Sequence, residues 1–286
     1  TQGTQAIESI FQQVNGQTNN DLDVVIVGAG PAGIAASLSA MEKNLKFKTI
    51  EQESLGGTVS TFPRGKIVMT APVHLPLIGT VRFKETTKEK LLEFWESVVE
   101  KTGLKISFNE RVEAITRHDE YFEIITNKNT LRSRTVLLAI GRRGTPRKLG
   151  VAGENHNKVV YRLVDPAQYR GQHVLVVGGG DSALEAAYSI ADEEGTTVSL
   201  SYRSEAFSRA KEKNRTRVDQ YASTQKINVY MKSTVKHIAE ETVCIEHEGE
   251  TIEFKNDAII VCAGGILPTG FLKDIGIEVE TKFGTI

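Results

Sequence analysis

Two short glycine-rich segments constrain the fold of this chain more than any other feature of its sequence. The first, VIVGAGPAGIAA, covers residues 25–36, and the second, VLVVGGGDSALEAA, covers residues 174–187. Each consists of an apolar run typical of a buried strand, then a glycine turn, then a helical pattern of small residues. A strand that turns tightly into a helix opens a βαβ unit. The sequence therefore predicts two such units within 286 residues.

The first turn matches the pattern GxGxxG at Gly28, Gly30 and Gly33. In this pattern the first glycine permits the tight turn, the second lets the backbone approach a diphosphate, and the third lets the helix pack close to the strand. The helix that begins with Pro31 and Ala32 offers free N–H groups and a positive dipole end to the phosphates. The alternative is a glycine turn that binds no ligand.

A carboxylate at the end of the next predicted strand favours a nucleotide at the first turn. The segment FKTIEQ places Glu51 near the end of that strand, so that residues 24–51 form one βαβ unit. Glu51 follows the glycines by about 20 residues, where a carboxylate can accept hydrogen bonds from both ribose hydroxyls. Its charge argues against a 2′-phosphate there, because two anions would be pressed together.

The second turn has the variant pattern GxGxxA, at Gly178, Gly180 and Ala183, and its helix opens with Asp181 and Ser182. This turn also predicts a diphosphate-binding site at the amino end of a helix.

The strand that follows the second turn ends in cations instead of an acid. Arg203 stands at the strand end and Arg209 lies just beyond it. A guanidinium with forked donors and compensating charge suits the 2′-phosphate of NADPH. The alternative is a solvated basic surface, since Glu205 and Glu212 dilute the positive charge.

Composition restricts the classes of partner. The chain is 40% hydrophobic and 25% charged, with a formal net charge of -1, which is ordinary for a globular protein and gives no general attraction to nucleic acid or anionic membranes. Its longest apolar runs are strand-sized, far short of the roughly 20 residues that cross a bilayer. Cys244 and Cys262 form no CxxC motif, which indicates neither a zinc site nor a disulfide framework and fits a cytoplasmic protein.

Residues 1–20 are rich in Gln, Asn and Thr and lack the features of a signal peptide, so we interpret them as a polar tail or linker, with an upstream fused domain left open. Residues 85–104 give the clearest helical pattern, for which Thr86 and Glu89 predict a capping box and Gly103 predicts the end. The strands that follow, up to residue 141, are typical of an antiparallel meander that returns to the parent sheet.

With both turns in place, the chain resembles the thioredoxin-reductase-like branch of the two-dinucleotide-binding flavoproteins, within the pyridine nucleotide-disulfide oxidoreductase superfamily. The segments GAGPAGIAA, AIGRRGTPRKLGVAGE, VVGGGDSALEAA and DAIIVCAGGILPT occur in that family's order, over roughly residues 22 to 280. The resemblance implies an α/β fold of two Rossmann-like, three-layer domains. The NAD(P)-binding domain, residues 150–255, would be inserted into an FAD-binding domain of residues 21–149 and 256–286.

The resemblance also implies cofactors and site residues. FAD would bind at the first turn and NADP at the second, with NADPH preferred over NADH. Further cofactor contacts are expected at Gln52, Gly57, Thr58, Val112, Gly141 and Gly264. Arg142 and Arg143 are candidates for the FAD phosphates or for a basic turn without function, and His74 has no visible partner. No catalytic residue and no metal ligand is assigned.

Two departures from the family pattern narrow the function. Tyr161 and Val164 stand where thioredoxin reductases carry a redox-active CxxC, so the chain cannot run internal dithiol chemistry and is more similar to ferredoxin-NADP reductases of this type. Bacillithiol-disulfide reductase-like proteins are also similar, but they place a cysteine where Ala32 stands. The sequence stops at Ile286, before the family's C-terminal Gly-Asp motif. Either this chain ends short of its natural terminus or the flavin site is built differently, so tight FAD retention is in question.

We therefore expect an FAD-dependent NAD(P)H oxidoreductase that transfers electrons from NADPH through the flavin to an external acceptor. The acceptor could be ferredoxin, flavodoxin, a small disulfide or a fused redox domain, and a homodimer is left open. The alternative is a nucleotide-binding sensor or interaction module with weak or lost flavin binding.

Overall fold

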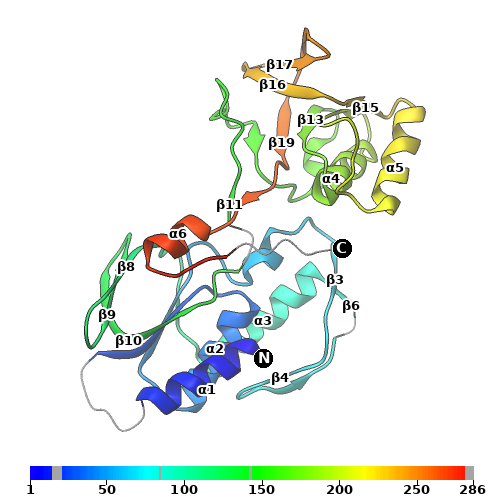
Figure 1. Ribbon diagram of the computed structural model, residues 1–286. Helices are drawn as coiled ribbons and strands as arrows, with labels where there is room; N and C mark the ends of the chain where they lie inside the picture. Colours follow the sequence, from blue (N-terminus) through cyan, green and yellow to red (C-terminus); the bar gives the residue numbers. More distant parts are fainter. Residues whose placement is uncertain (15–20, 84, 142–143, 281–286) are drawn as a thin grey trace. The chain divides into compact units, whose positions relative to one another are not determined.

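The computed structural model describes residues 1–14, 21–83, 85–141 and 144–280. The chain divides into two compact units, and many of their helices and strands are labelled in Figure 1. The first unit comprises Thr1–Thr61, Gly65–Gly144 and Leu267–Ile286, and the second comprises Phe62–Arg64 and Thr145–Ile266. Arg142 and Arg143 lie outside the described residues.

The first unit is built on a six-stranded sheet with the order β7-β2-β1-β10-β9-β8. β1 pairs in parallel with β2 and β10, whereas β9 pairs antiparallel with β10 and β8, as expected for the meander. β7 instead pairs in parallel with β2. The strands are β1 Leu22–Val27, β2 Phe47–Ile50, β7 Ile106–Ser107, β8 Val112–Arg117, β9 Phe122–Thr126 and β10 Thr130–Leu138.

Both faces of β1 are buried, which explains its continuous apolar run. Val24 and Ile26 pack with the helices α1 and α2, whereas Val25 and Val27 pack with residues of the meander. The helices of this unit are α1 Gln2–Val14, α2 Pro31–Glu42, α3 Lys88–Thr102 and α6 Thr269–Asp274. Shorter elements are η1 Gly57–Thr61, β3 Ile67–Met69, β4 Val73–Leu75, β5 Gly79–Val81 and β6 Glu85–Thr87.

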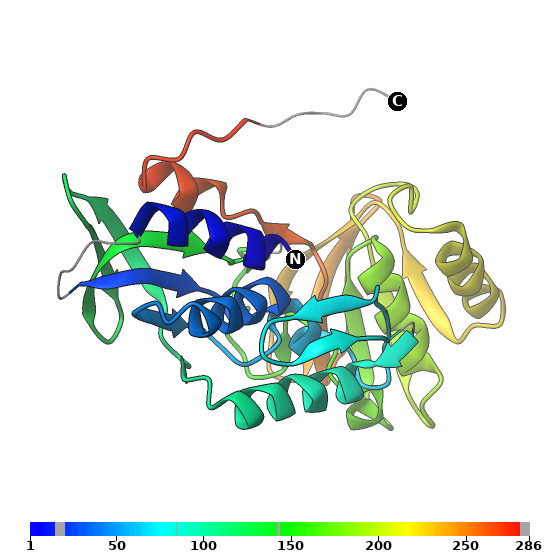
Figure 2. The same cartoon turned by 90° about the horizontal axis from the view of Figure 1, so that it is seen from below.

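The sequence predicted a polar tail or linker over residues 1–20. In the structure, residues 2–14 instead form the helix α1, the darkest blue helix in Figure 2. Gly3, Ile7 and Val14 are buried on one face of α1. The contact is close, since a Cβ on Gly3 would lie 2.2 Å from the carbonyl oxygen of Ala32 in α2. A helix stabilised mainly by packing of this kind carries only a weak compositional signal.

The start of α3 differs from the capping box predicted for Thr86 and Glu89. The N-cap is Thr87, whose hydroxyl accepts a hydrogen bond from the Lys90 N–H at 3.4 Å, while Thr86 lies within β6. The carboxylate of Glu89 accepts a hydrogen bond from the Gly65 N–H, outside the helix, at 3.0 Å. The predicted end is confirmed, because Gly103 caps the helix in the left-handed region with φ of 68°.

The second unit contains a five-stranded parallel sheet with the order β12-β19-β13-β14-β15. One face packs against α4 and α5, and the other packs against an antiparallel sheet of β16, β17 and β18. The parallel strands are β12 Val159–Val160, β13 His173–Val177, β14 Thr197–Ser201, β15 Ile227–Tyr230 and β19 Ala258–Val261. The other elements are β11 Thr145–Pro146, η2 Pro166–Tyr169, α4 Asp181–Ala191, α5 Glu212–Ser223, β16 Ser233–Ile238, β17 Thr242–His247, β18 Glu250–Lys255 and β20 Gly265–Ile266.

The boundaries between the units differ from those expected at 149/150 and 255/256. β19 is fully buried and pairs with β13 in the middle of the second sheet, so it belongs to the second unit rather than to the segment 256–286 of the first. β11 and β20 pair with each other beyond it. Among the described residues, no helix is long and apolar enough to cross a membrane.

Candidate functional site

The first glycine turn, between β1 and α2, requires glycine at two positions. Gly28 has φ of +111°, and a Cβ on it would lie 2.5 Å from the carbonyl oxygen of Ala139. A Cβ on Gly33 would lie 1.8 Å from the carbonyl oxygen of Gly28. Both side chains would collide with backbone, so these residues set the close approach of α2 to β1 and β10.

Gly30 differs from its two neighbours in the motif because the space around it is open. It is the N-cap of α2 with extended backbone, and a Cβ on it would approach only the Cα of Gly57, at 3.9 Å. Its N–H has no acceptor among the described residues. The first turn of α2, with Pro31 and Ala32 exposed, adds the unpaired N–H groups of a helix start. These features fit an anion such as a diphosphate held by the backbone.

Glu51 connects the end of β2 to the first glycine turn by hydrogen bonds. Its carboxylate is buried and accepts hydrogen bonds from the N–H of Ala29 at 2.7 Å and of Glu53 at 2.9 Å. The carbonyl of Ala29 in turn accepts a hydrogen bond from the Gly56 N–H at 3.0 Å. The end of β2, the glycine turn and the following Gly56–Gly57 turn are thus tied to one another. Glu51 therefore lies next to the first glycine turn, as the sequence predicted.

The other candidates for the first site are distributed more widely. Gln52 and Thr58 are exposed, and Gly57 packs its backbone against Gly30. Val112 is partly buried among the core residues of the meander, and Gly141 follows β10 with φ of +67°. Gly264 lies in the second unit, where its carbonyl accepts a hydrogen bond from the Arg147 N–H at 3.0 Å. His74 is exposed and lies 3.4 Å from the Thr80 hydroxyl.

The second glycine turn, between β13 and α4, repeats the plan of the first. Gly178 has φ of +142°, and a Cβ on it would lie 2.5 Å from the carbonyl oxygen of Cys262. Gly180 is the N-cap of α4, and a Cβ on it would meet no atom within 4 Å. Its N–H has no acceptor among the residues described. Ala183 is fully buried, which shows that a methyl group fits at the third position of this turn.

Two residues of the second turn make contacts that the sequence did not reveal. The ring of Tyr202 lies over Gly179, 2.4 Å from the position that a Cβ would take. The carboxylate of Asp181 accepts hydrogen bonds from the N–H of Lys211 at 2.8 Å and from the side-chain amide of Asn214 at 2.7 Å. An aromatic residue directly at a strand end was the available signal for the first contact. Ser182 is exposed in the first turn of α4.

Arg203 and Arg209 lie in the loop that follows β14. Both side chains are exposed, and neither forms an ion pair or a hydrogen bond within the described part of the chain. Cations without an internal partner remain available for an external anion. Both follow β14, the strand parallel to β13, and their role at a 2′-phosphate stays a prediction.

At the position of the missing dithiol, Tyr161 and the buried Glu154 form a partly buried network. The Tyr161 hydroxyl donates to Glu154 at 2.8 Å, and the same carboxylate accepts from the N–H groups of Leu149 at 2.5 Å and Gly150 at 2.7 Å. Burial alone would raise the pKa of the Glu154 carboxyl, but these three donors hold the pKa below its ordinary value. Burial and the bond to Glu154 raise the pKa of Tyr161 to about 12. Neither Cys244 nor Cys262 forms a disulfide within the described part of the chain.

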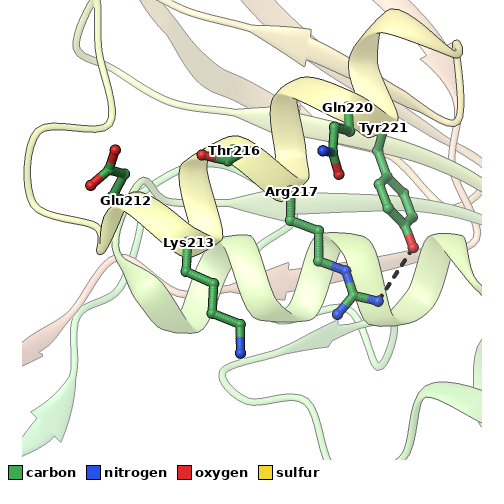
Figure 3. A pocket seen from close by; sticks show the side chains of 6 residues that line it. All are labelled: Glu212, Lys213, Thr216, Arg217, Gln220 and Tyr221. Atoms are coloured by element: carbon green, nitrogen blue, oxygen red, sulfur yellow. Dashed lines mark hydrogen bonds between the residues drawn. The ribbon is translucent and has the colours of Figure 1, made fainter.

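Figure 3 shows the six residues of α5 that line a shallow pocket: Glu212, Lys213, Thr216, Arg217, Gln220 and Tyr221. The Arg217 guanidinium lies 4.1 Å from the centre of the Tyr188 ring and donates to the Tyr221 hydroxyl at 3.3 Å. It also donates to Asp192 at 3.0 Å. Since Arg217 is fully engaged with these groups, this surface stabilises the packing of α5 on α4.

The family follows from sequence comparison. The profile of the pyridine nucleotide-disulphide oxidoreductase family matches residues 25–285, nearly the whole chain. The chain belongs to this family. Like other members of the pyridine nucleotide-disulphide oxidoreductase family, it is an oxidoreductase. The family and the enzyme class predicted from the sequence are therefore confirmed.

Two relatives in the family carry a more specific name. The ferredoxin–NADP reductase of Acholeplasma laidlawii is 30% identical over 266 residues, which are 91% of this chain and 79% of the relative. The ferredoxin–NADP reductase of Picrophilus torridus is 30% identical over 272 residues, which are 91% of this chain and 78% of the relative.

Solved structures of the family confirm the fold class. Thioredoxin reductase from Lactococcus lactis is 26% identical, with a TM-score of 0.68 over 90% of this chain and 82% of that protein. Bacillithiol disulfide reductase from Staphylococcus aureus is 24% identical, with a TM-score of 0.77 over 92% of this chain and 83% of that protein. The second likeness shows the fold alone.

Proposed function

We propose that this member of the family is an NADPH-dependent flavoprotein reductase that passes electrons to an external acceptor. The observation that carries the proposal is the presence of two separate glycine turns, each with an open, unpaired backbone N–H at the start of a helix. One unit has an acid beyond its turn and the other has two free arginines. This difference supports FAD at the first turn and NADPH at the second.

In the first unit, the N–H groups around Gly30 and the start of α2 would hold the diphosphate of FAD. Glu51 is fixed by the N–H groups of Ala29 and Glu53, and its remaining acceptor sites face ribose hydroxyls in this proposal. In the second unit, Gly180 and α4 would hold the diphosphate of NADPH, with Arg203 and Arg209 at its 2′-phosphate. Bound FAD would supply hydride acceptance from NADPH and release of electrons singly or in pairs.

The acceptor is external because the chain has no dithiol of its own. Tyr161 and Val164 occupy the relevant positions, and Tyr161 is engaged with Glu154. The relatives named ferredoxin–NADP reductase support a small redox protein as acceptor. The two cysteines form no CxxC motif and no disulfide among the described residues, which fits a reducing, cytoplasmic compartment. The homodimer and the fused redox domain remain predictions.

Anaerobic titration tests this function directly. The protein reconstituted with FAD is expected to be yellow, and its flavin absorbance should bleach on addition of NADPH and return with oxidised ferredoxin or another one-electron acceptor. A protein that binds NADPH but cannot be reconstituted with FAD would contradict the proposal and favour the sensor or interaction module.

Replacement of Arg203 tests the coenzyme assignment. We expect Arg203→Ala to weaken NADPH binding by about 1.5–3 kcal/mol, the scale of a hydrogen bond to a charged group, and to leave NADH binding nearly unchanged. Calorimetric titration with both coenzymes measures the difference. Lys255→Ala, which removes an exposed cation at the end of β18, is the control and should change neither value. Equal losses for both coenzymes in Arg203→Ala would reject the role.

A further inference from the structure

We propose that the loop of residues 202–211, here called the arginine loop, is fixed at both ends to the second glycine turn and that this anchoring sets the preference for NADPH. Tyr202 and Asp181 are the positioning residues. The inference rests on the proposed NADPH site, because it concerns how Arg203 and Arg209 are presented to the 2′-phosphate.

The first anchor is aromatic. The Tyr202 ring covers Gly179, whose missing side chain leaves room for it, and stacks on the Phe207 ring with centroids 5.6 Å apart. Gly179 is buried and Phe207 is only 5% exposed. The backbone of Tyr202 is also held, since its N–H donates to the Tyr230 carbonyl at 3.0 Å. The loop therefore leaves β14 in contact with the glycine turn itself.

The second anchor is polar. One oxygen of Asp181, Oδ1, accepts both the Lys211 N–H at 2.8 Å and the Asn214 side-chain amide at 2.7 Å. Asn214 is 5% exposed and is further placed by Glu185, at 3.4 Å, and by the Tyr188 hydroxyl, at 3.3 Å. The far end of the arginine loop is thus bound to the first residue of α4.

The two arginines stand next to these anchors but take no part in them. Arg203 follows Tyr202 directly, and Arg209 precedes Lys211 by two residues. Buried Phe207 and Ala210 hold the segment between them. A loop that is ordered before the coenzyme arrives loses less conformational entropy on binding, so its cations bind the 2′-phosphate more tightly.

The charge of Asp181 gives this inference a distinctive signature. A carboxylate at the start of α4 lies close to the proposed diphosphate site and repels the anion that both coenzymes share. Its anchoring of the arginine loop, however, benefits only the coenzyme with a 2′-phosphate. Removal of Asp181 should therefore weaken NADPH relative to NADH, instead of weakening both.

Binding of NADPH and NADH to full-length variants tests the inference. In Asp181→Ala and Tyr202→Ala, the ratio of the two dissociation constants is expected to move about tenfold toward NADH, with NADH binding unchanged or tighter. Asp181→Asn keeps an acceptor oxygen and Tyr202→Phe keeps the ring, so both should retain the wild-type ratio. Combined with Arg203→Ala and Arg209→Ala together, the Asp181→Ala change should add little, because both of the groups that it positions are gone.

Three outcomes would overturn the anchoring: equal loss of both coenzymes, full additivity with the double change of Arg203 and Arg209 to alanine, or failure of Asp181→Asn and Tyr202→Phe to keep the wild-type ratio. Amide hydrogen exchange gives a second measurement, since residues 203–211 should exchange faster in Asp181→Ala than in the wild type. Unchanged exchange in a folded variant contradicts the inference. If instead Arg203→Ala alone has no effect on NADPH, the proposed coenzyme site is wrong and not merely its anchoring.

Discussion

Replacement of Gly33 by alanine is expected to destabilise the first unit and to abolish flavin retention. A Cβ at this position would lie 1.8 Å from the carbonyl oxygen of Gly28, and that oxygen belongs to backbone held between β1 and α2. Because neither partner is the end of a flexible side chain, α2 must move away from the sheet. We expect the free energy of unfolding of this unit to fall by roughly 3 kcal/mol, the scale of strong overpacking in a core.

Gly30→Ala is the matched change within the same turn. A Cβ there would be in ordinary contact with Gly57 at 3.9 Å, and the φ of -75° suits any residue. The fold should therefore tolerate this alanine within about 1 kcal/mol, the usual range at an N-cap. FAD binding should nevertheless fall, because the methyl group points into the space where we place the diphosphate.

The single tryptophan of the chain separates these two effects. Trp95 lies in α3 of the first unit and is 6% exposed, so its fluorescence reports the unfolding of that unit. Urea unfolding followed at Trp95 should shift in Gly33→Ala and remain nearly unchanged in Gly30→Ala. If both variants keep bound FAD and wild-type unfolding curves, the first turn does not hold the diphosphate.

Glu154→Ala is expected to lower the stability of the second unit by an amount that depends on pH. Glu154→Ala removes the acceptor of three donors, the N–H groups of Leu149 and Gly150 and the Tyr161 hydroxyl. Hydrogen bonds to a charged group are strong, and partly buried donors would be left unpaired. We expect a loss of about 3 kcal/mol at neutral pH.

The pH dependence follows from the direction of the pKa shift. The pKa of Glu154 is lowered in the folded protein relative to 4.5, so its contribution to stability is present above about pH 4.5 and is lost as the pH falls through the folded value. The difference in stability between wild type and Glu154→Ala should therefore shrink in acid. Urea unfolding followed by circular dichroism measures it at several pH values.

Glu240→Gln is the control for this experiment because Glu240 is an exposed acid of the same unit, without a partner in the described part of the chain. It should change stability by less than about 0.5 kcal/mol at any pH. A Glu154→Ala variant as stable as this control would show that the network contributes nothing net.

The parts of the site that could be predicted from sequence are those fixed by local backbone geometry. Gly28 and Gly178 take backbone conformations that other residues rarely adopt, so a strand, a glycine turn and a helix follow from one short motif. The distance from the turn to Glu51 is set by the length of one helix and one strand. The two turns, with the strand and helix that flank each of them, were therefore predictable, and the family was confirmed by comparison.

The remainder depended on contacts between residues far apart in the chain. Helix α1 exists because Gly3 and Ile7 pack against α2, and nothing in the composition of residues 1–20 required it. The unit boundary lies beyond β19 because that strand pairs with β13. Likewise, the sequence did not reveal that the carboxylate of Asp181 accepts a hydrogen bond from the N–H of Lys211, in the loop before α5. Each outcome was decided by tertiary packing, which single-residue patterns do not encode.

The third position of the motif is Gly33 in the first turn and Ala183 in the second. Because of this difference, the motif can be transferred between the two turns in one direction only. The second unit already holds the methyl of Ala183 without strain, whereas the first leaves no room for one at Gly33. A chimera that carries the flavin-side motif in the coenzyme unit keeps its backbone spacing and gains only a small void. A chimera that carries the motif of the second turn in the first unit forces α2 away from its sheet. Only the first motif can therefore be moved into the other unit without displacing a helix.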